Sequence, residues 1–150
     1  MDFPHGFLLF LMALAFHNVG VTWFAQIAVY PLFGMVGTSE YVPYHSFYSR
    51  HIALPVIVPG FVSFLAPLAF VFIRPESVPA WLALANAACG ILSLMVTVGL
   101  EIPRHARLRA QGKNVVLIRQ LVAYNWPRTF GISASAILTT CMVVGAFTPA

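Results

Sequence analysis

The chain has 150 residues, of which 60% are hydrophobic and only 8% are charged, and its mean hydropathy is +0.86. A soluble domain carries about a quarter charged residues, so eight Lys and Arg with four Asp and Glu are too few to cover a water-facing surface. The composition therefore indicates an integral membrane protein and excludes an ordinary soluble enzyme, a disordered segment and a conventional nucleic-acid binder, although the net charge is +4.

Four stretches without any charged residue divide the chain, and each is long enough for the roughly 20 apolar residues that cross a bilayer core. We place the spans near residues 6–30, 52–73, 79–101 and 128–147. The apolar runs are continuous rather than alternating, which argues against a β-barrel. The first run is too long for a cleavable signal peptide and lacks a basic start, so we expect it to be retained. The predicted fold is an all-α bundle of four transmembrane helices, with a single domain over residues 1–150.

The connections between the spans predict the orientation. Basic side chains concentrate in the third connection: Arg104, Arg107, Arg109, Lys113 and Arg119. Because short basic loops stay inside, this connection is expected to be cytoplasmic and both termini outside. Apolar residues recur at helical spacing over 114–124, which predicts a short cytoplasmic interfacial helix between the third and fourth spans. Asn125 and Pro127 suit the cap and the first turn of the fourth span.

Polar side chains recur at helical spacing within three of the spans. They are Asn18, Thr22, Gln26 and Tyr30 in the first, Asn86, Ser93, Thr97, Glu101 and His105 in the third, and Asn125, Thr129 and Ser133 in the fourth. Polar groups are costly against lipid, so we expect these faces to turn toward one another and to form a polar interior that opens at the cytoplasmic end. The alternative is a set of hydrogen bonds that only holds the bundle together, each worth about 0.6 kcal/mol. His17, in mid-span, is expected to be neutral and bonded to an Asn or Thr of a neighbouring helix.

Four titratable groups gather at the cytoplasmic ends of the spans: His45, His51, Glu101 and His105. Imidazole with carboxylate suits iron, copper, zinc or manganese, so these four residues are candidate metal ligands. His45 and His105 could instead bind a haem axially among aromatic side chains, of which Tyr48 is one. A third alternative is a metal-free acid–base pair of Glu101 and His105 that acts on a lipid-soluble substrate. A fourth is a structural cluster of ion pairs with neighbouring arginines.

Two residues at the start of the fourth span flank this cluster. Arg128 either reaches out to lipid phosphate or points inward, where it would neutralise Glu101 or an anionic substrate. We take Glu101 and Arg128 as the catalytic candidates. Asn125 is a candidate for positioning the substrate or a cofactor.

Several short motifs carry a resemblance to a known group. They are Thr22-Trp23-Phe24-Ala25-Gln26, Tyr30-Pro31-Leu32-Phe33, Tyr44-His45, Pro103-x-His105 and Asn125-Trp126-x-Arg128-Thr129. These motifs resemble those of small bacterial membrane proteins with four spans, which are loosely similar to the domain-of-unknown-function family that includes anthrone-oxygenase-like proteins. The resemblance implies a four-helix fold in the inner membrane of a bacterium and oxygenase-type chemistry on a hydrophobic polycyclic substrate. In that group the position of Glu101 often holds Gln, which makes a carboxylate ligand less essential than His45 or His105.

These observations lead to two functional predictions, besides a transporter or proton-conducting protein, which four spans without an inverted repeat suit poorly. The first is a membrane-embedded oxidoreductase or oxygenase-like protein that binds a metal ion (iron or copper) or haem, together with an apolar small molecule, at the cytoplasmic end of the bundle. The second is a non-enzymatic accessory or interaction subunit of a larger membrane complex, because the chain is short and has small-residue faces. The expected partners are the lipid bilayer, an apolar small molecule, and a second copy of the chain or a membrane-complex partner, with no nucleic acid.

Overall fold

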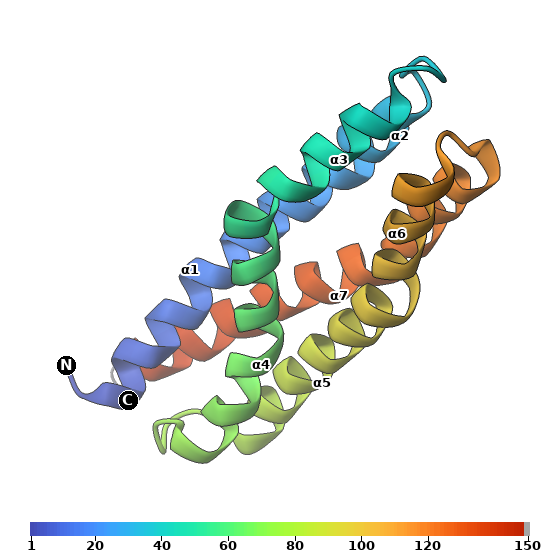
Figure 1. Ribbon diagram of the computed structural model, residues 1–150. Helices are drawn as coiled ribbons and strands as arrows, with labels where there is room; N and C mark the ends of the chain where they lie inside the picture. Colours follow the sequence, from blue (N-terminus) through green and yellow to red (C-terminus); the bar gives the residue numbers. More distant parts are fainter. Residues whose placement is uncertain (149–150) are drawn as a thin grey trace.

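The computed structural model describes residues 1–148, and within this range every regular element is a helix (Figure 1). In chain order the α-helices are α1 (Phe3–Phe24), α2 (Tyr30–Phe33), α3 (Tyr41–His51), α4 (Val58–Ile73), α5 (Ala80–Val96), α6 (Ile102–Gln111) and α7 (Val115–Phe147). Three π-helical turns lie between them: η1 (Ala25–Val29), η2 (Ala53–Ile57) and η3 (Thr97–Glu101).

Successive elements join into four long continuous helices. They run over Phe3–Phe33, Ala53–Ile73, Ala80–Gln111 and Val115–Phe147, and each is long and apolar enough to cross a membrane. The prediction of an all-α bundle with four membrane-spanning helices is confirmed to this extent. Three of the four have 31, 32 and 33 residues, which corresponds to about 45–50 Å at 1.5 Å per residue. They are therefore longer than the roughly 30 Å of a bilayer core requires.

The fourth long helix begins earlier than predicted. The side chain of Asn114 accepts a hydrogen bond from the Leu117 N–H at 3.1 Å and caps α7 at its first residue, Val115. Residues 114–124 are therefore the first turns of α7. The separate interfacial helix expected between the third and fourth spans is not confirmed.

The same difference changes the roles of two residues. Asn125 lies inside α7 and does not cap it, and Pro127 lies in the helix interior instead of the first turn. A proline inside a helix removes one backbone donor. Prolines are nevertheless tolerated in membrane helices, because neighbouring groups can satisfy the freed carbonyl.

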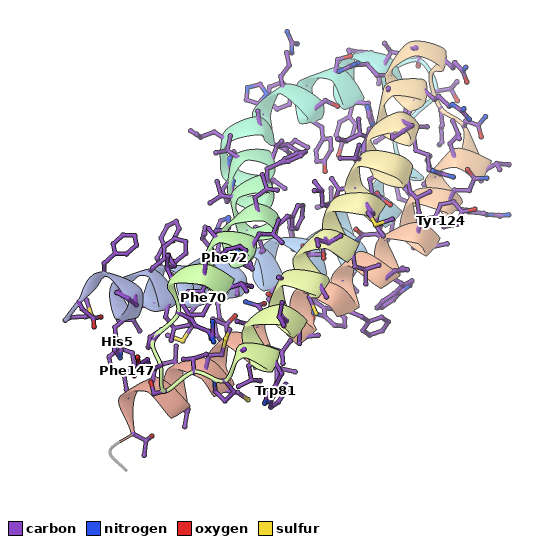
Figure 2. All side chains as sticks on the ribbon, turned by 90° about the horizontal axis from the view of Figure 1, so that it is seen from below. His5, Phe70, Phe72, Trp81, Tyr124 and Phe147 are labelled. Carbon is purple, nitrogen blue, oxygen red and sulfur yellow. The ribbon has the colours of Figure 1, made fainter. Side chains whose placement is uncertain are left out.

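The termini and the turns define the two ends of the bundle. Both termini lie at one end, where the His5 ring packs edge-on against Phe147 with 5.2 Å between the ring centroids (Figures 1 and 2). The opposite end carries the turns over residues 34–40 and 112–114, and Tyr124 lies toward it in Figure 2. Most of the basic side chains lie within or on either side of the second turn in the sequence, so we call this the basic end.

Each end has its own apolar core. The core near the termini contains Leu8, Leu11, Phe70, Val78, Leu82, Ala83 and Met142. The core at the basic end contains Ala25, Tyr30, Phe33, Tyr41, Leu108, Leu117, Ile118 and Leu121. The buried polar side chains of the long helices lie mainly between these two cores along the chain.

Close packing between α4 and α5 depends on one glycine. A Cβ atom at Gly90 would lie 2.6 Å from the backbone carbonyl oxygen of Phe64, which is closer than real Cβ contacts come. The absence of a side chain thus lets the two helix backbones approach, as small residues do in membrane bundles.

Prolines account for the three π-helical turns. Each turn ends two residues before a proline, and these are Pro31, Pro59 and Pro103. A proline has no N–H, and its ring crowds the carbonyl four residues earlier. The chain responds by widening the preceding turn, so that in η1 the Tyr30 N–H bonds to the Ala25 carbonyl five residues back. The equivalent bond closes η2 and η3.

Candidate functional site

Most of the polar side chains predicted from helical spacing are buried inside the bundle, whereas His105 and Ser133 are half-buried. Side chains at most 4% exposed are Asn18, Thr22, Gln26 and Tyr30 on the first long helix, Asn86, Ser93, Thr97 and Glu101 on the third, and Asn125 and Thr129 on the fourth. Contacts join the helices: the Asn125 side-chain amide donates to Gln26 Oε1 at 2.8 Å, and Gln26 Nε2 donates to the Val122 carbonyl at 3.0 Å. The expectation that these faces turn toward one another is confirmed.

The amide donor of Asn125 is thus used within the bundle. It contacts Gln26 and also Thr129 Oγ1, at 3.2 Å. The candidate role of Asn125 in positioning a substrate or cofactor stays a prediction, and the contacts shown are those of a residue that ties α1 and η1 to α7.

A cavity of about 160 Å³ lies beside this polar layer, toward the basic end. All three π-helical turns contribute to its walls, with Ala25 and Val29 from η1, Val56 and Ile57 from η2, and Thr97 and Glu101 from η3. The other polar side chains that line it are Tyr30, Tyr48, His105 and Arg128, and the remaining lining residues are apolar. Single π-helical turns occur frequently at functional sites, and here three of them surround one cavity.

Glu101 and Arg128 line this cavity from η3 and α7 without pairing with each other. Glu101 is 1% exposed and Arg128 is 9% exposed. No carboxylate of the described residues 1–148 lies within 4 Å of the Arg128 nitrogens, whose contacts are to Thr97 Oγ1 and the Tyr30 hydroxyl, each at 3.5 Å. Within the same range neither Glu101 oxygen, nor Arg128 Nε, has a partner in good hydrogen-bonding geometry, although the Tyr30 hydroxyl lies near Glu101. Buried polar groups are nearly always bonded. The Glu101 carboxyl group and the Arg128 guanidinium group therefore have hydrogen-bonding capacity for a bound molecule.

A histidine pair lies next to the cavity. His45 Nε2 of α3 and His105 Nδ1 of α6 are 3.1 Å apart, and His105 Nε2 is 3.3 Å from the Tyr30 hydroxyl. The Phe33 ring packs edge-on against both imidazoles, with centroids 5.2 and 6.0 Å away. Tyr48 stacks beside His105 at 5.9 Å. The structure thus brings together Tyr48 and the two histidines singled out in the sequence.

The charge state of His45 follows from its surroundings. Its side chain is fully buried, and burial, with the Arg109 cation adding to it, lowers the pKa of His45 to about 4. His45 is therefore a neutral imidazole at neutral pH. Burial also raises the pKa of Tyr48 to about 12, so that phenol stays protonated.

The structure does not bring His51 into this cluster. His51 is exposed at the end of α3, where its Nδ1–H donates to the Phe47 carbonyl at 2.8 Å and its ring stacks on Phe47. In the described part of the chain no three His, Cys, Asp or Glu side chains gather closely enough to hold one metal ion. His45 and His105 are bonded to each other, whereas two axial haem ligands approach from opposite faces of the macrocycle. Ligation of a metal ion or of haem therefore stays a prediction.

His17 has a different partner from the one expected. Its Nε2–H donates to the backbone carbonyl of Pro55 at 2.9 Å, not to an Asn or Thr side chain. Pro59 explains this contact, because it has no N–H to offer the carbonyl four residues earlier. His17 therefore satisfies an acceptor that a proline has freed, and it takes no part in the cavity.

Two contacts near the site were not predicted from the sequence: that of Ser49 with His45 and that of Thr97 with Arg128. Ser49 lies four residues after His45 on α3, and its Oγ is 3.5 Å from His45 Nδ1. That spacing places two side chains on one helical face, so it is the signal that could have identified Ser49. Thr97 was recognised as part of a polar face, but its contact with Arg128 depends on the π-helical turn, for which the sequence offers no simple pattern.

No family model matches the chain, and no curated protein and no solved structure matches it either.

Proposed function

We propose that the protein is a membrane-embedded enzyme that binds an apolar small molecule with an oxygen-bearing head group and transfers a proton to or from it. The observation that carries this proposal is the pair of Glu101 and Arg128, which line one cavity with their hydrogen-bonding capacity largely unused. Unpaired buried charges destabilise a fold. A ligand that contacts both side chains accounts for their placement.

The chemistry follows from the residue types. Glu101 is a suitable general base for a proton next to a carbonyl group. Arg128, which lines the same cavity, would stabilise the negative charge that then develops on the carbonyl oxygen. The low polarity of the remaining walls strengthens such interactions.

The size of the cavity limits the substrate. About 160 Å³ is close to the roughly 150 Å³ of an engineered apolar cavity in another protein that binds benzene. The reacting part of the substrate is therefore about one ring in size. Phe24 and Ile102 line the cavity and are also 64% and 43% exposed, so the rest of a larger apolar molecule would extend between them into lipid.

The same proposal places the protein in the inner membrane of a bacterium, with the basic end in the cytoplasm and both termini outside. About 20 residues are enough to cross the bilayer core, and counting them from the end with the termini reaches the residues that line the cavity. The site would then lie at the cytoplasmic boundary of the hydrocarbon region, where an amphipathic molecule has its polar head.

Two measurements on protein purified in lipid nanodiscs test the proposal. Mass spectrometry of the extracted lipids should show a small molecule that is retained by the wild type and lost in Val56→Trp, which fills the cavity. Val62→Trp on the same segment is the matched control, because Val62 lies outside the cavity and is 37% exposed. The retained molecule, returned to the protein in D₂O, should gain deuterium with the wild type and not with Glu101→Gln.

Other outcomes would contradict this function. An empty cavity together with a stoichiometric co-purifying protein would favour the accessory subunit expected from the sequence. A retained molecule that gains no deuterium would leave a binding protein without proton-transfer activity. The metal- or haem-dependent oxidoreductase stays a prediction, which the metal analysis in the Discussion tests.

A further inference from the structure

A line of polar groups runs from the cavity to the face of α3. Arg128 Nη2 lies 3.5 Å from the Tyr30 hydroxyl, which lies 3.3 Å from His105 Nε2. His105 Nδ1 lies 3.1 Å from His45 Nε2, and His45 Nδ1 lies 3.5 Å from Ser49 Oγ. His45 is fully buried, whereas Ser49 is half-buried. The five groups thus connect the cavity to a side chain that reaches the surface of α3.

The donors and acceptors of this line have one direction. The Ser49 hydroxyl donates to the His45 carbonyl at 2.8 Å, so its oxygen is available to accept from His45 Nδ1–H. In a neutral imidazole the other nitrogen is an acceptor, so His45 Nε2 accepts from His105 Nδ1–H. By the same rule His105 Nε2 accepts from the Tyr30 hydroxyl, whose oxygen accepts from Arg128. Every donor therefore points from the cavity toward Ser49.

The groups around the pair are consistent with two neutral rings. Arg109 of α6 acts on both imidazoles and Arg128 of α7 acts on His105, and each repels an added positive charge. Tyr41 and Tyr48 of α3, which pack against His45, both have their pKa raised to about 12 by burial and stay uncharged. In the part of the chain that the structure describes, no carboxylate oxygen lies within 4 Å of a nitrogen of either ring.

We propose that Tyr30, His105, His45 and Ser49 form a proton path between the cavity and the surface of α3. A proton in the cavity, which in the proposed function Glu101 takes from the bound molecule, binds the Tyr30 oxygen while the hydroxyl proton of Tyr30 passes to His105 Nε2. The Nδ1 proton of His105 then passes to His45 Nε2, and the Nδ1 proton of His45 leaves through the Ser49 oxygen to water. One proton enters the path and one leaves it, and no bond between heavy atoms is formed or broken.

The path also restricts the reaction class. After one passage both imidazoles carry their proton on Nε2, so the line points the other way and cannot pass a second proton outward. A reaction that later returns a proton to the substrate resets both rings. Isomerisation by removal and return of a proton meets this requirement. This last step rests on the proposed function, whereas the path itself does not.

Nuclear magnetic resonance of protein labelled with ¹⁵N-histidine, without added ligand, tests the direction of the line. At neutral pH both rings should be neutral with the proton on Nδ1, and His45→Gln and His105→Gln identify which signals belong to which ring. Either ring with its proton on Nε2, or a positively charged ring, would overturn the proposal on the wild-type protein alone.

Exchange with water tests transfer along the line. Ser49→Val removes the terminal hydroxyl and fills its space with methyl groups, so exchange of the His105 ring N–H should slow at least about tenfold, a change of roughly 1.4 kcal/mol in barrier. Ser46→Val on the same helix is the matched control and should have no effect. Equal exchange rates in both variants would show that α3 opens instead of conducting protons. Because no substrate is needed, these results stand apart from the deuterium test of the proposed function.

Discussion

Glu101 and Arg128 line the same cavity from different helices, and neither an ion pair nor a hydrogen bond joins them. Each is more than nine-tenths buried. A pair of this kind is unfavourable for the empty protein, since charge burial without good pairing destabilises a fold. The arrangement becomes favourable once a ligand supplies the missing contacts.

The first prediction concerns this stored destabilisation. Glu101→Gln removes a buried carboxylate that has no partner, so the empty protein should gain about 1–2 kcal/mol in stability. Thermal unfolding in detergent should therefore show a higher Tm, together with loss of deuterium transfer to the substrate. Glu76→Gln, at an exposed position on the turn between α4 and α5, should leave Tm unchanged. A lower Tm for Glu101→Gln would mean that the carboxylate is already well bonded.

The second prediction concerns the contact between α4 and α5. Gly90→Ala would place a methyl group 2.6 Å from the Phe64 carbonyl oxygen, so the helices must separate, at about 1–3 kcal/mol. Gly20→Ala meets nothing within 4 Å among the described residues and should be neutral or stabilising, because alanine favours a helix. Similar unfolding temperatures for the two variants would contradict the close approach.

The third prediction concerns His17 and the proline-freed carbonyl of Pro55. His17→Leu should destabilise the protein by about 1–2 kcal/mol, since the Pro55 carbonyl loses the side-chain donor that stands in for the missing Pro59 N–H. In a Pro59→Ala background the restored backbone N–H bonds to Pro55, and the same substitution should cost less. A double-mutant cycle measures this coupling. Additive effects would show that His17 does not act through that carbonyl.

The fourth prediction is a pH dependence. Burial lowers the pKa of His45 to about 4 in the folded protein, whereas an unfolded histidine has a pKa of about 6.5. Between these values the unfolded chain binds more protons, so stability rises with pH. The contribution is complete above about pH 6.5 and is lost as the pH falls toward 4. As the pH is lowered from about 6.5 to 4, Tm should fall less steeply for His45→Gln than for the wild type.

The fifth prediction distinguishes proton transfer from metal chemistry. Protein purified and then treated with a strong chelator should keep its Tm and its histidine tautomers, because His45 and His105 are bonded to each other. Elemental analysis and the absorption spectrum of the untreated protein provide the direct check. Stoichiometric iron or copper that is lost in both His45→Gln and His105→Gln would instead support the oxidoreductase expected from the sequence.

Much of the fold follows from the positions of charged and polar residues. Spacing of four residues predicted one face for Asn18, Thr22, Gln26 and Tyr30, and all four are buried. The approach of His45 to His105 was also expected, and the structure places them 3.1 Å apart. Lipid enforces such patterns, because polar groups in a span must find partners within the protein.

Other parts could not be predicted for physical reasons. The start of α7 was misplaced because Asn125 and Pro127 are typical of the first turn of a helix. In the structure the helix continues through Pro127, because the loss of one backbone donor does not end a long helix whose other hydrogen bonds are kept. The partner of His17 is a backbone carbonyl, and spacing describes side chains only. The cavity depends on three wide turns, whose effect on neighbouring helices is visible only in three dimensions.

Those wide turns also mean that the site depends on prolines outside the cavity as much as on the residues that line it. A π-helical turn accommodates one more residue than an α-helical turn, and one residue corresponds to about 100° of rotation about the helix axis. Replacing Pro103 by a residue with an N–H would let η3 become a regular α-helical turn with every residue kept, and His105 would then turn by about that angle away from Tyr30. The prolines at 31, 59 and 103 thus set the angular register of each wall, and the loss of one of them would disassemble the site without altering any side chain that lines it.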